Sequence, residues 1–411
     1  MTRPVPVSLL LLSCLLQTSF ASAWSLTGRA SLFANEAKDH GQSDSSQAQS
    51  SQDQQSLRLM LENITDNNEI VLHGRVQRRH FSSTPTDKSL APELFRLGAD
   101  SLKWQESQWT TNCQNGACTQ ISGDIDRLFY RHHQSQMSWT IGRQALDWGV
   151  GRFWQPMNLL GAFAPTELDT DFKTGVDALS VDWYPSLFST LTFVWAAQSS
   201  KIQPSKISPS KVPSHEQNIL LHYRAQASDA SEIGLMAGNV LGDPVIAASF
   251  ETDWQGIGWR LEAQQKHKDA LGNRLWWIAG FDTQFEDGTL LTLEWHDNAF
   301  GAQHTSDISQ RLTDPGLVSA LEPHMVRHVL GLSLQHTLSP LWQGGYSLFA
   351  AMLDTNPSYL HQLHVTRSLS NEADLTLTLL HATGQASQNG LPQSEFGSVP
   401  DSISLRLRGY F

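Results

Sequence analysis

The chain has 411 residues, with 28 Lys and Arg against 40 Asp and Glu, and a formal charge of −12 at pH 7. This acidic balance argues against nucleic acid as a partner, because binding to a phosphate backbone needs a basic surface. Beyond the N-terminus no segment has the ~18 consecutive apolar residues of a transmembrane helix. A protein that crosses a membrane with helices is therefore not expected.

Residues 1–23 have the layout of a secretory signal peptide. Arg3 gives a basic start, a short apolar run follows, and Ala-Ser-Ala at 21–23 forms a small-residue cleavage site. A lipoprotein box that ends at Cys14 is the alternative, but the apolar run continues past that cysteine. We expect residues 24–411 to form the mature chain as a single domain, with a charge of −13 because Arg3 is the only charged side chain removed.

The mature chain consists largely of segments in which apolar and polar side chains alternate, and a period of two predicts strands. In chain order these segments are 24–33, 56–64, 69–80, 124–133, 136–146, 175–184, 188–198, 216–226, 231–239, 243–251, 255–267, 274–285, 289–298, 327–338, 341–353, 358–369, 373–382 and 403–411. Short connections alternate with long ones, as is typical of membrane barrels. We expect an all-β, antiparallel, up-and-down transmembrane barrel of about 18 strands with long extracellular loops. A count of 16 applies if two weak segments lie outside the wall.

The last predicted strand orients the whole barrel. Its even and odd positions differ in kind, with one apolar face (Ile403, Leu405, Leu407 and Phe411) and one polar face (Ser404, Arg406 and Arg408). A strand of this type that ends in Tyr410-Phe411 resembles the signal read by the bacterial barrel-assembly machinery. We expect that machinery, outer-membrane lipid and lipopolysaccharide to be partners, with the protein in the bacterial outer membrane and its C-terminus on the periplasmic side.

Charged residues within the alternating segments should face the lumen, since facing acyl chains costs ~2–4 kcal/mol at the bilayer midplane. The lumen-facing candidates are Arg260, Glu262, Glu294, His296, Arg406 and Arg408. If the acidic excess lines the lumen, a mild preference for cations follows. The alternative is that acidic surface loops carry the excess.

Two segments are expected to be loops. Residues 40–56 are Ser, Gln and Asp with little to bury, which predicts a mobile loop. Residues 93–123 are placed in a long external loop that carries a Cys113–Cys118 hairpin, although 95–105 can be interpreted as a further strand. In that loop Cys113 and Cys118 flank an Asn-Gly turn, which predicts a disulfide in an exported protein. A metal pair is the alternative, but no nearby His or Cys completes a four-ligand set. No metal or other cofactor is expected.

The segment 141–180 is the most distinctive. It contains Gly142-Arg143-Gln144, Trp148-Gly149, Pro156 and a returning Gly175-x-Asp177-Ala178. This pattern resembles that of a broad, mostly uncharacterised group of porin-like outer-membrane barrels of Gram-negative bacteria. Asn158 stands where such proteins often have Asp. The resemblance implies a type of barrel and leaves the solute open.

Arg143 and Asp177 interrupt the lipid-facing pattern of adjacent predicted strands at a similar height. We expect them to form a cross-strand ion pair at the outer rim, or a bulge to turn both inward. A substrate-binding pair is the more specific alternative.

The predicted loop 147–174 mixes apolar and charged residues. Folding it into the lumen would bury the apolar ones and set the charged ones across the pore, where rings of charge select solutes. The candidate residues of this constriction are Arg152, Trp154, Glu167, Asp169, Asp171 and Lys173. The alternative is an external loop packed over its neighbours or against lipopolysaccharide.

These features predict a porin-like channel for the passive passage of small hydrophilic solutes, and a homo-oligomer is compatible with the sequence. A structural or export barrel with a plugged lumen is the alternative. An outer-membrane hydrolase is a third interpretation, but the chain has neither a Gly-x-Ser-x-Gly nor a His-Glu-x-x-His motif. An enzyme is therefore not expected.

Overall fold

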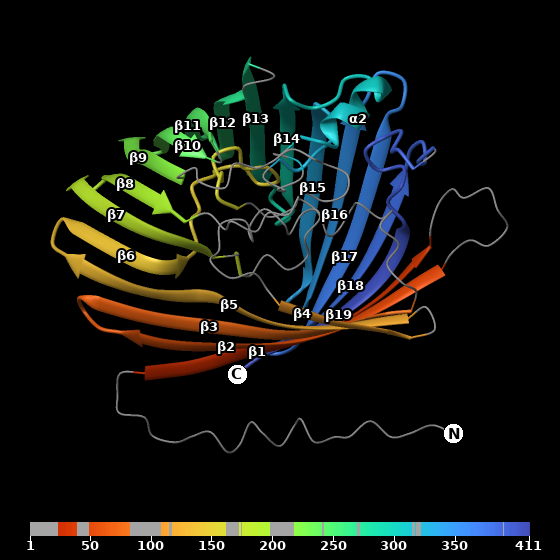
Figure 1. The fold of residues 1–411 in the computed structure, drawn as a ribbon, viewed down its shortest axis with the longest axis horizontal. Coiled ribbons are helices and arrows are strands. Elements are labelled where there is room, and N and C mark those ends of the chain that lie inside the picture. The colour runs from red at the N-terminus through yellow and green to blue at the C-terminus, as the bar shows by residue number, and fades with distance from the viewer. Residues whose placement is uncertain are drawn as a thin grey trace.

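The computed structural model describes residues 24–38, 49–82, 108–114, 117–161, 172–173, 175–197, 218–240, 242–268, 272–314, 317, 322–388 and 390–411. Strands of these residues form one antiparallel sheet that closes on itself (Figure 1). No helix among them is long and apolar enough to cross a membrane. The predicted signal peptide, residues 1–23, lies outside the described residues.

The strands are β1 (Trp24–Lys38), β2 (Gln49–Ile64), β3 (Asn68–Phe81), β4 (Gln108–Gln114), β5 (Ala117–Gln134), β6 (Met137–Gln144), β7 (Val176–Ser186), β8 (Ser189–Ala196), β9 (Asn218–Ser228), β10 (Ser231–Val240), β11 (Asp243–Trp254), β12 (Ile257–Lys268), β13 (Gly272–Gln284), β14 (Leu290–Asn298), β15 (His328–Ser339), β16 (Trp342–Met352), β17 (Ser358–Ser370), β18 (Ala373–Thr383) and β19 (Asp401–Tyr410). A short helical turn, η3 (Thr305–Asp307) and α2 (Ile308–Arg311), follows β14.

Eighteen of these strands form the wall. β5 pairs with β3 on one side and β6 on the other, so β4, which pairs with β5, is an added hairpin strand. β1 pairs with both β2 and β19, and this last pairing closes the ring. The 18-stranded antiparallel barrel predicted from the sequence is therefore confirmed.

The prediction of a mobile loop over residues 40–56 is wrong for residues 49–56. These residues begin β2 and pair with the end of β1, from Lys38↔Gln49 to Ser31↔Ser56. A strand that continues beyond the lipid keeps its backbone hydrogen bonds without needing an apolar face, so its side chains do not alternate. Residues 40–48 lie outside the described residues.

The Cys113–Cys118 hairpin predicted within residues 93–123 is present, but its strands are longer than expected: residues 108–114 form β4, and residues 117–123 form the first part of the wall strand β5. Cys113 and Cys118 face each other in this hairpin and form a disulfide, with their Cα atoms 4.1 Å apart. β3 extends to Phe81 and pairs with the other edge of β5. Residues 93–107, including the extra strand considered over 95–105, lie outside the described residues.

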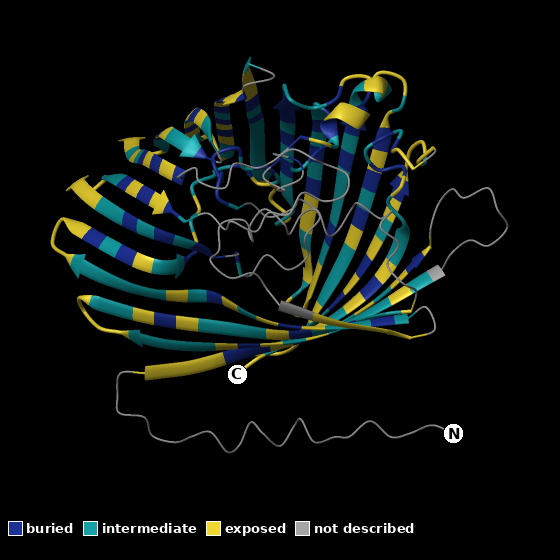
Figure 2. Ribbon diagram, in the orientation of Figure 1, coloured by how far each residue is buried: buried dark blue, intermediate teal, exposed yellow. Residues whose placement is uncertain are grey.

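The outer surface of the barrel is apolar. On β19 the side chains of Ile403, Leu405 and Leu407 are exposed, whereas Ser404 between them is buried, and Figure 2 shows this alternation along many strands. An exposed apolar surface of this extent is unstable in water and requires lipid around it. Aromatic side chains lie exposed at strand ends near the short turns (Trp183, Tyr184, Trp342, Tyr410 and Phe411), where they meet the lipid–water boundary.

The C-terminal residue completes the closure of the ring. The N–H of Gly28 donates to the carbonyl of Phe411 at 2.8 Å, and the N–H of Phe411 donates to the carbonyl of Gly28 at 3.1 Å. A Cβ on Gly28 would lie 2.2 Å from the Phe411 ring. The ring therefore packs directly on the glycine of β1.

Gly142, near the end of β6, has a backbone that other residues rarely adopt. Its φ is +119°, and a Cβ would lie 2.2 Å from the carbonyl oxygen of Leu128 on β5. Because the obstructing atom belongs to the backbone, it cannot move without distorting the sheet. The glycine of the Gly-Arg-Gln segment is therefore a steric requirement.

Gly142→Ala should destabilise the barrel by about 2 kcal/mol or more, because overpacking and backbone strain add together. Gly123→Ala is the matched control, since a Cβ on Gly123 meets nothing within 4 Å. Urea unfolding of the refolded barrels, followed by heat-modifiable gel mobility, measures the difference. Equal stability of the two variants would contradict the steric argument.

Candidate functional site

After β6 the chain turns into the barrel. The segment 145–161, here called the inner loop, lies inside the ring of strands (Figure 1, yellow). Its apolar residues pack on the inner face of the wall: Met157, Leu159 and Leu160 pack with residues of β7 to β11, and Trp154 packs with residues of β13, β15 and β16. The inner loop is therefore attached to a large part of the wall, from β7, to which it connects, round to β16.

Glu262 on β12 binds one part of the inner loop. Its carboxylate accepts the backbone N–H groups of Val150 at 2.7 Å and Gly151 at 3.4 Å, and also that of Met157. Gly151 can approach so closely because it has no side chain: a Cβ would lie 2.3 Å from Ile278 of β13. Glu262 is 1% exposed, so the three amides take the place of water.

Glu294 on β14 binds the adjoining part in the same way. It accepts the backbone N–H groups of Arg152 at 2.8 Å, Phe153 at 3.2 Å and Trp154 at 2.9 Å. Hydrogen bonds to a carboxylate are stronger than those between neutral groups. Glu262 and Glu294 together thus bind six backbone amides of the inner loop, those of residues 150–154 and of Met157.

Trp154 is the largest fully buried side chain of the loop, with 1% exposure. Its ring lies 5.1 Å from that of His296 on β14 and 6.1 Å from that of Phe349 on β16, measured between centroids. Its Nε1–H donates to Nε2 of His324 at 2.7 Å. His296, predicted to face the lumen, therefore packs on the inner loop.

Asn158 holds the inner loop together from within. Its Oδ1 accepts the N–H groups of Trp148 at 2.7 Å and Gly149 at 3.1 Å. Its Nδ2 donates to Asp147 at 2.6 Å and to Gln155. An Asp at this position would have no N–H to donate and would face the Asp147 carboxylate, which gives a physical reason for the amide in this chain.

The returning part of the loop contacts the opposite wall. The Phe172 ring lies under the guanidinium groups of Arg58 on β2 at 3.9 Å and of Arg29 on β1 at 4.8 Å. Lys173 is buried, and its Nζ lies 3.0 Å from Oδ1 of Asp147. The described parts of the connection thus touch both sides of the lumen. Glu167, Asp169 and Asp171 lie outside the described residues.

Arg143 and Asp177 lie directly opposite each other on β6 and β7. They form a two-pronged ion pair, with Nε to Oδ1 at 2.7 Å and Nη2 to Oδ2 at 2.8 Å. Nη1 of Arg143 also donates to the carbonyl of Ile125 at 2.6 Å. The pair joins the two strands at the points where the connection leaves and returns.

Arginines face the lumen on neighbouring strands β19, β1, β2, β3 and β5. Arg29, Arg58 and Arg75 are direct neighbours across three strands. The whole set, here called the arginine row, comprises Arg29, Arg58, Arg75, Arg79, Arg127, Arg131, Arg406 and Arg408. Carboxylates between them relieve the repulsion: Asp126 pairs with Arg58, and Asp374 pairs with Arg408 at 3.1 Å. Sequence alternation identified only the two arginines of β19.

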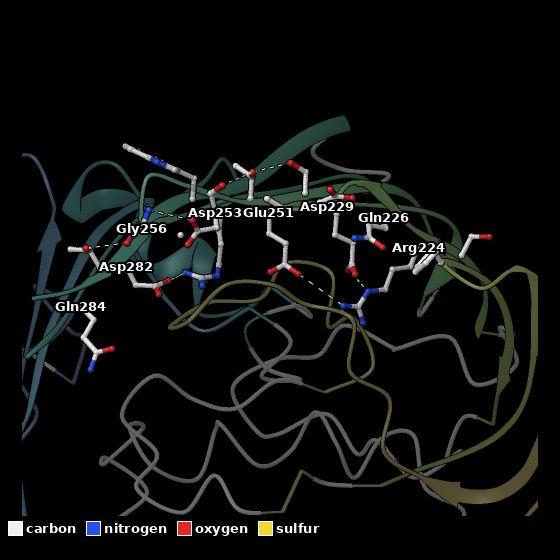
Figure 3. A pocket seen from close by; sticks show the side chains of 18 of the residues that line it. Arg224, Gln226, Asp229, Glu251, Asp253, Gly256, Asp282 and Gln284 are labelled. Carbon is white, nitrogen blue, oxygen red and sulfur yellow. Dashed lines mark hydrogen bonds and ion pairs between the residues drawn. The ribbon is translucent and has the colours of Figure 1, made fainter. Parts of the chain in front are cut away.

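A cavity of about 760 Å³ lies on the opposite wall, near the short turns (Figure 3). Its charged lining residues come from β9 to β13 and the turn after β9, and they are Arg224, Asp229, Glu232, Glu251, Asp253, Arg260 and Asp282. Arg260, predicted to face the lumen, pairs here with Asp282. Carboxylates outnumber cations in this cavity, so the two walls differ in charge. In the part of the chain that the structure describes, no group of three or more His, Cys, Asp and Glu could hold a metal ion.

Glu294→Gln should loosen the inner loop, because the amide replaces one acceptor oxygen by N–H groups that face the loop's own N–H groups. The loss should amount to ~1–3 kcal/mol. Hydrogen exchange of the amides of residues 152–154, measured by mass spectrometry, should accelerate. Glu36→Gln, a change at an exposed residue of β1, is the control, and unchanged exchange in Glu294→Gln would contradict the role of the carboxylate.

Burial lowers the pKa of Lys173 to about 8, although the nearby Asp147 carboxylate acts in the opposite direction. Raising the pH from about 7 to about 9 should therefore remove the ammonium charge and shift the reversal potential toward cations. In the unfolded chain Lys keeps its proton up to a pKa of ~10.4, so this group makes stability rise with pH between those two values. Lys173→Gln should show neither change, and an identical pH response would refute the assignment.

Comparison with known proteins identifies the fold. No family model matches the chain, and no curated protein matches its sequence. Among solved structures, a BenF-like porin from Pseudomonas fluorescens Pf-5 is 8% identical, with a TM-score of 0.59 over 96% of this chain and 100% of that one. OccAB4 from Acinetobacter baumannii is 8% identical, with a TM-score of 0.58 over 95% and 99%. OccK1 (OpdK) from Pseudomonas aeruginosa is 11% identical, with a TM-score of 0.56 over 94% and 98%. The chain thus has the fold of an outer-membrane porin, and its apolar belt and 18 strands place it in a bacterial outer membrane.

Proposed function

We propose that the protein is a porin-like channel through which small hydrophilic solutes cross the outer membrane passively. The observation that carries this proposal is the attachment of the inner loop inside the barrel by Glu262 and Glu294. Hydrogen bonds to six of its amides hold the loop in one position against the wall, so the loop narrows the lumen without blocking it. The fold that this chain shares with solved porins is compatible with such a channel.

We propose further that the 147–174 connection forms the constriction. Arg152 lies 3.6 Å from Asp282 on one wall, and on the other wall the carbonyl of Lys173 accepts a hydrogen bond from Arg127 of the arginine row. Glu167, Asp169 and Asp171 would lie between these two points in the chain. Charged side chains placed across a narrow passage act on every solute that passes, because the low-dielectric walls reduce screening.

The charge of the two walls bears on solute preference. The acidic sequence predicted a mild preference for cations if the acidic excess lined the lumen. Instead, arginines outnumber carboxylates on β19, β1, β2, β3 and β5, whereas several carboxylates elsewhere are bound to loop amides or to cations. We therefore propose a preference for small solutes that carry a carboxylate or another anionic group. A solved structure of OpdK contains vanillate, which is compatible with this proposal.

Other features complete the proposal. Residues 1–23 would direct export and be cleaved, Tyr410-Phe411 would be recognised by the barrel-assembly machinery, and lipopolysaccharide would surround the outer rim. The likeness of segment 141–180 to porin-like barrels would reflect the same loop arrangement. A homo-oligomer is compatible with this function, and no catalytic role is proposed.

A plugged barrel is a second candidate because further connections enter the lumen. His324 of the β14–β15 connection packs on Trp154, and Phe396 of the β18–β19 connection belongs to the same buried cluster and lies against His324. If these connections fill the remaining space, the barrel would conduct no ions and would serve a structural or export role. The following measurement separates the two.

Purified protein in a planar bilayer should give stable conductance steps and, in a salt gradient, a reversal potential that indicates anion preference. Replacing Glu167, Asp169 and Asp171 by Gln or Asn should shift that potential further toward anions if these residues line the constriction. Asp66→Asn, at an exposed residue of a short turn, is the control. Absence of conductance would favour the plugged barrel, and unchanged selectivity would place the three carboxylates outside the pore.

A further inference from the structure

The indole of Trp154 ends a chain of hydrogen bonds that joins three connections of the barrel. Trp154 belongs to the inner loop, His324 to the β14–β15 connection and Glu395 to the β18–β19 connection. The Trp154 Nε1–H donates to Nε2 of His324 at 2.7 Å, and Nδ1 of His324 lies 2.9 Å from Oε1 of Glu395. The other oxygen of Glu395 accepts the N–H groups of Met325 at 3.0 Å and Val326 at 3.1 Å.

One protonation state of His324 fits this chain. An indole N–H can only donate, so Nε2 of His324 must carry a lone pair. The ionised Glu395 carboxylate can only accept, so Nδ1 must carry the proton. His324 therefore completes both bonds as the neutral tautomer with hydrogen on Nδ1. The side chains of His324 and Glu395 are each 6% exposed, so water cannot readily replace either partner.

The charges around His324 act in both directions. Glu395 favours an added positive charge on the ring. Arg311 of α2, whose Nη2 donates to the carbonyl of His324 at 3.0 Å, and the His296 ring of β14, 5.2 Å away, oppose it. Glu322 is engaged with Lys268 and with Arg311 at 2.8 Å in each case. Among the described residues, no acceptor other than His324 lies within hydrogen-bond distance of the Trp154 indole N–H.

We propose that His324 is a positioning residue: through Trp154 it holds residues 150–157, the tip of the inner loop, and it does so only while its ring is neutral. Acid therefore loosens the constriction. This inference rests on the proposed channel function. A proton on Nε2 would set two donors against each other, and the indole would lose its acceptor. The tip would then be retained by the amide bonds to Glu294.

The test uses full-length protein in planar bilayers between about pH 8 and pH 5. In wild type, current fluctuations should become about tenfold more frequent at the acid end, the factor expected for the loss of one buried hydrogen bond. His324→Gln offers an acceptor and a donor without titrating, and its fluctuation rate should stay nearly constant with pH. Trp154→Phe keeps a ring but has no N–H, and should fluctuate frequently at every pH.

His381→Gln is the matched control, because His381 is exposed and also faces a carboxylate, that of Asp401 at 2.9 Å. It should respond to pH as wild type does. A wild-type response that survives in His324→Gln, or no response in wild type, would overturn the proposal.

A second measurement separates this proposal from the channel function. Hydrogen exchange of residues 150–157 is compared between wild type and His324→Gln at each pH, which cancels the intrinsic pH dependence of exchange. Faster exchange in wild type than in His324→Gln, at acid pH alone, supports the role of His324 even if the barrel conducts no ions. Equal exchange at every pH contradicts it, whatever the conductance.

Discussion

The pairing of β1 with β19 is the constraint on which the rest of the structure depends. In hydrocarbon an unpaired backbone N–H or C=O group costs several kcal/mol, so a membrane sheet must have no edge. The reciprocal hydrogen bonds between Gly28 and Phe411 end this closure at the rim that carries the C-terminus. Once the ring is closed, every second side chain must face the lumen. The polar interior thus follows from the same alternation that gives the barrel its apolar belt.

A polar interior allows a connection to fold inward, provided that its amides find acceptors. Glu262 and Glu294 provide them for the inner loop, while Trp154, Met157 and Leu160 bury apolar surface against the wall. The oxygens of these two carboxylates therefore accept hydrogen bonds from the loop and are not available to a solute. Their charge is compensated by N–H groups before any solute arrives, so a sum of ionisable residues is a poor guide to what a solute encounters. On β19, β1, β2, β3 and β5, where arginines outnumber carboxylates, we expect the arginine row to act more strongly than these two carboxylates on a solute in the lumen.

The alternating strands could be predicted from sequence because lipid on one side and polar lumen on the other enforce a period of two. Where β2 and β5 extend beyond the lipid, that constraint ends, and residues 49–55 and 119–123 show no alternation of apolar and polar side chains. The lumen-facing side of Glu262 and Glu294 followed from alternation, but their partners did not. Trp154 lies 170 residues from His324 in the chain, and no local pattern encodes a contact at that separation. The amide of Asn158 likewise has a reason only when Asp147 is seen beside it.

The glycines of the distinctive segment suggest what its pattern specifies. Gly142 passes the carbonyl of Leu128, Gly175 passes that of Asp126, and Gly151 passes that of Trp154, each so closely that a Cβ would lie within 2.2 Å of the oxygen. Arg143 and Asp177 join the strands from which the connection departs. All of these residues fix how the chain leaves the wall and returns to it. Barrels that share this pattern would therefore share an inward loop while differing in the residues that meet the solute.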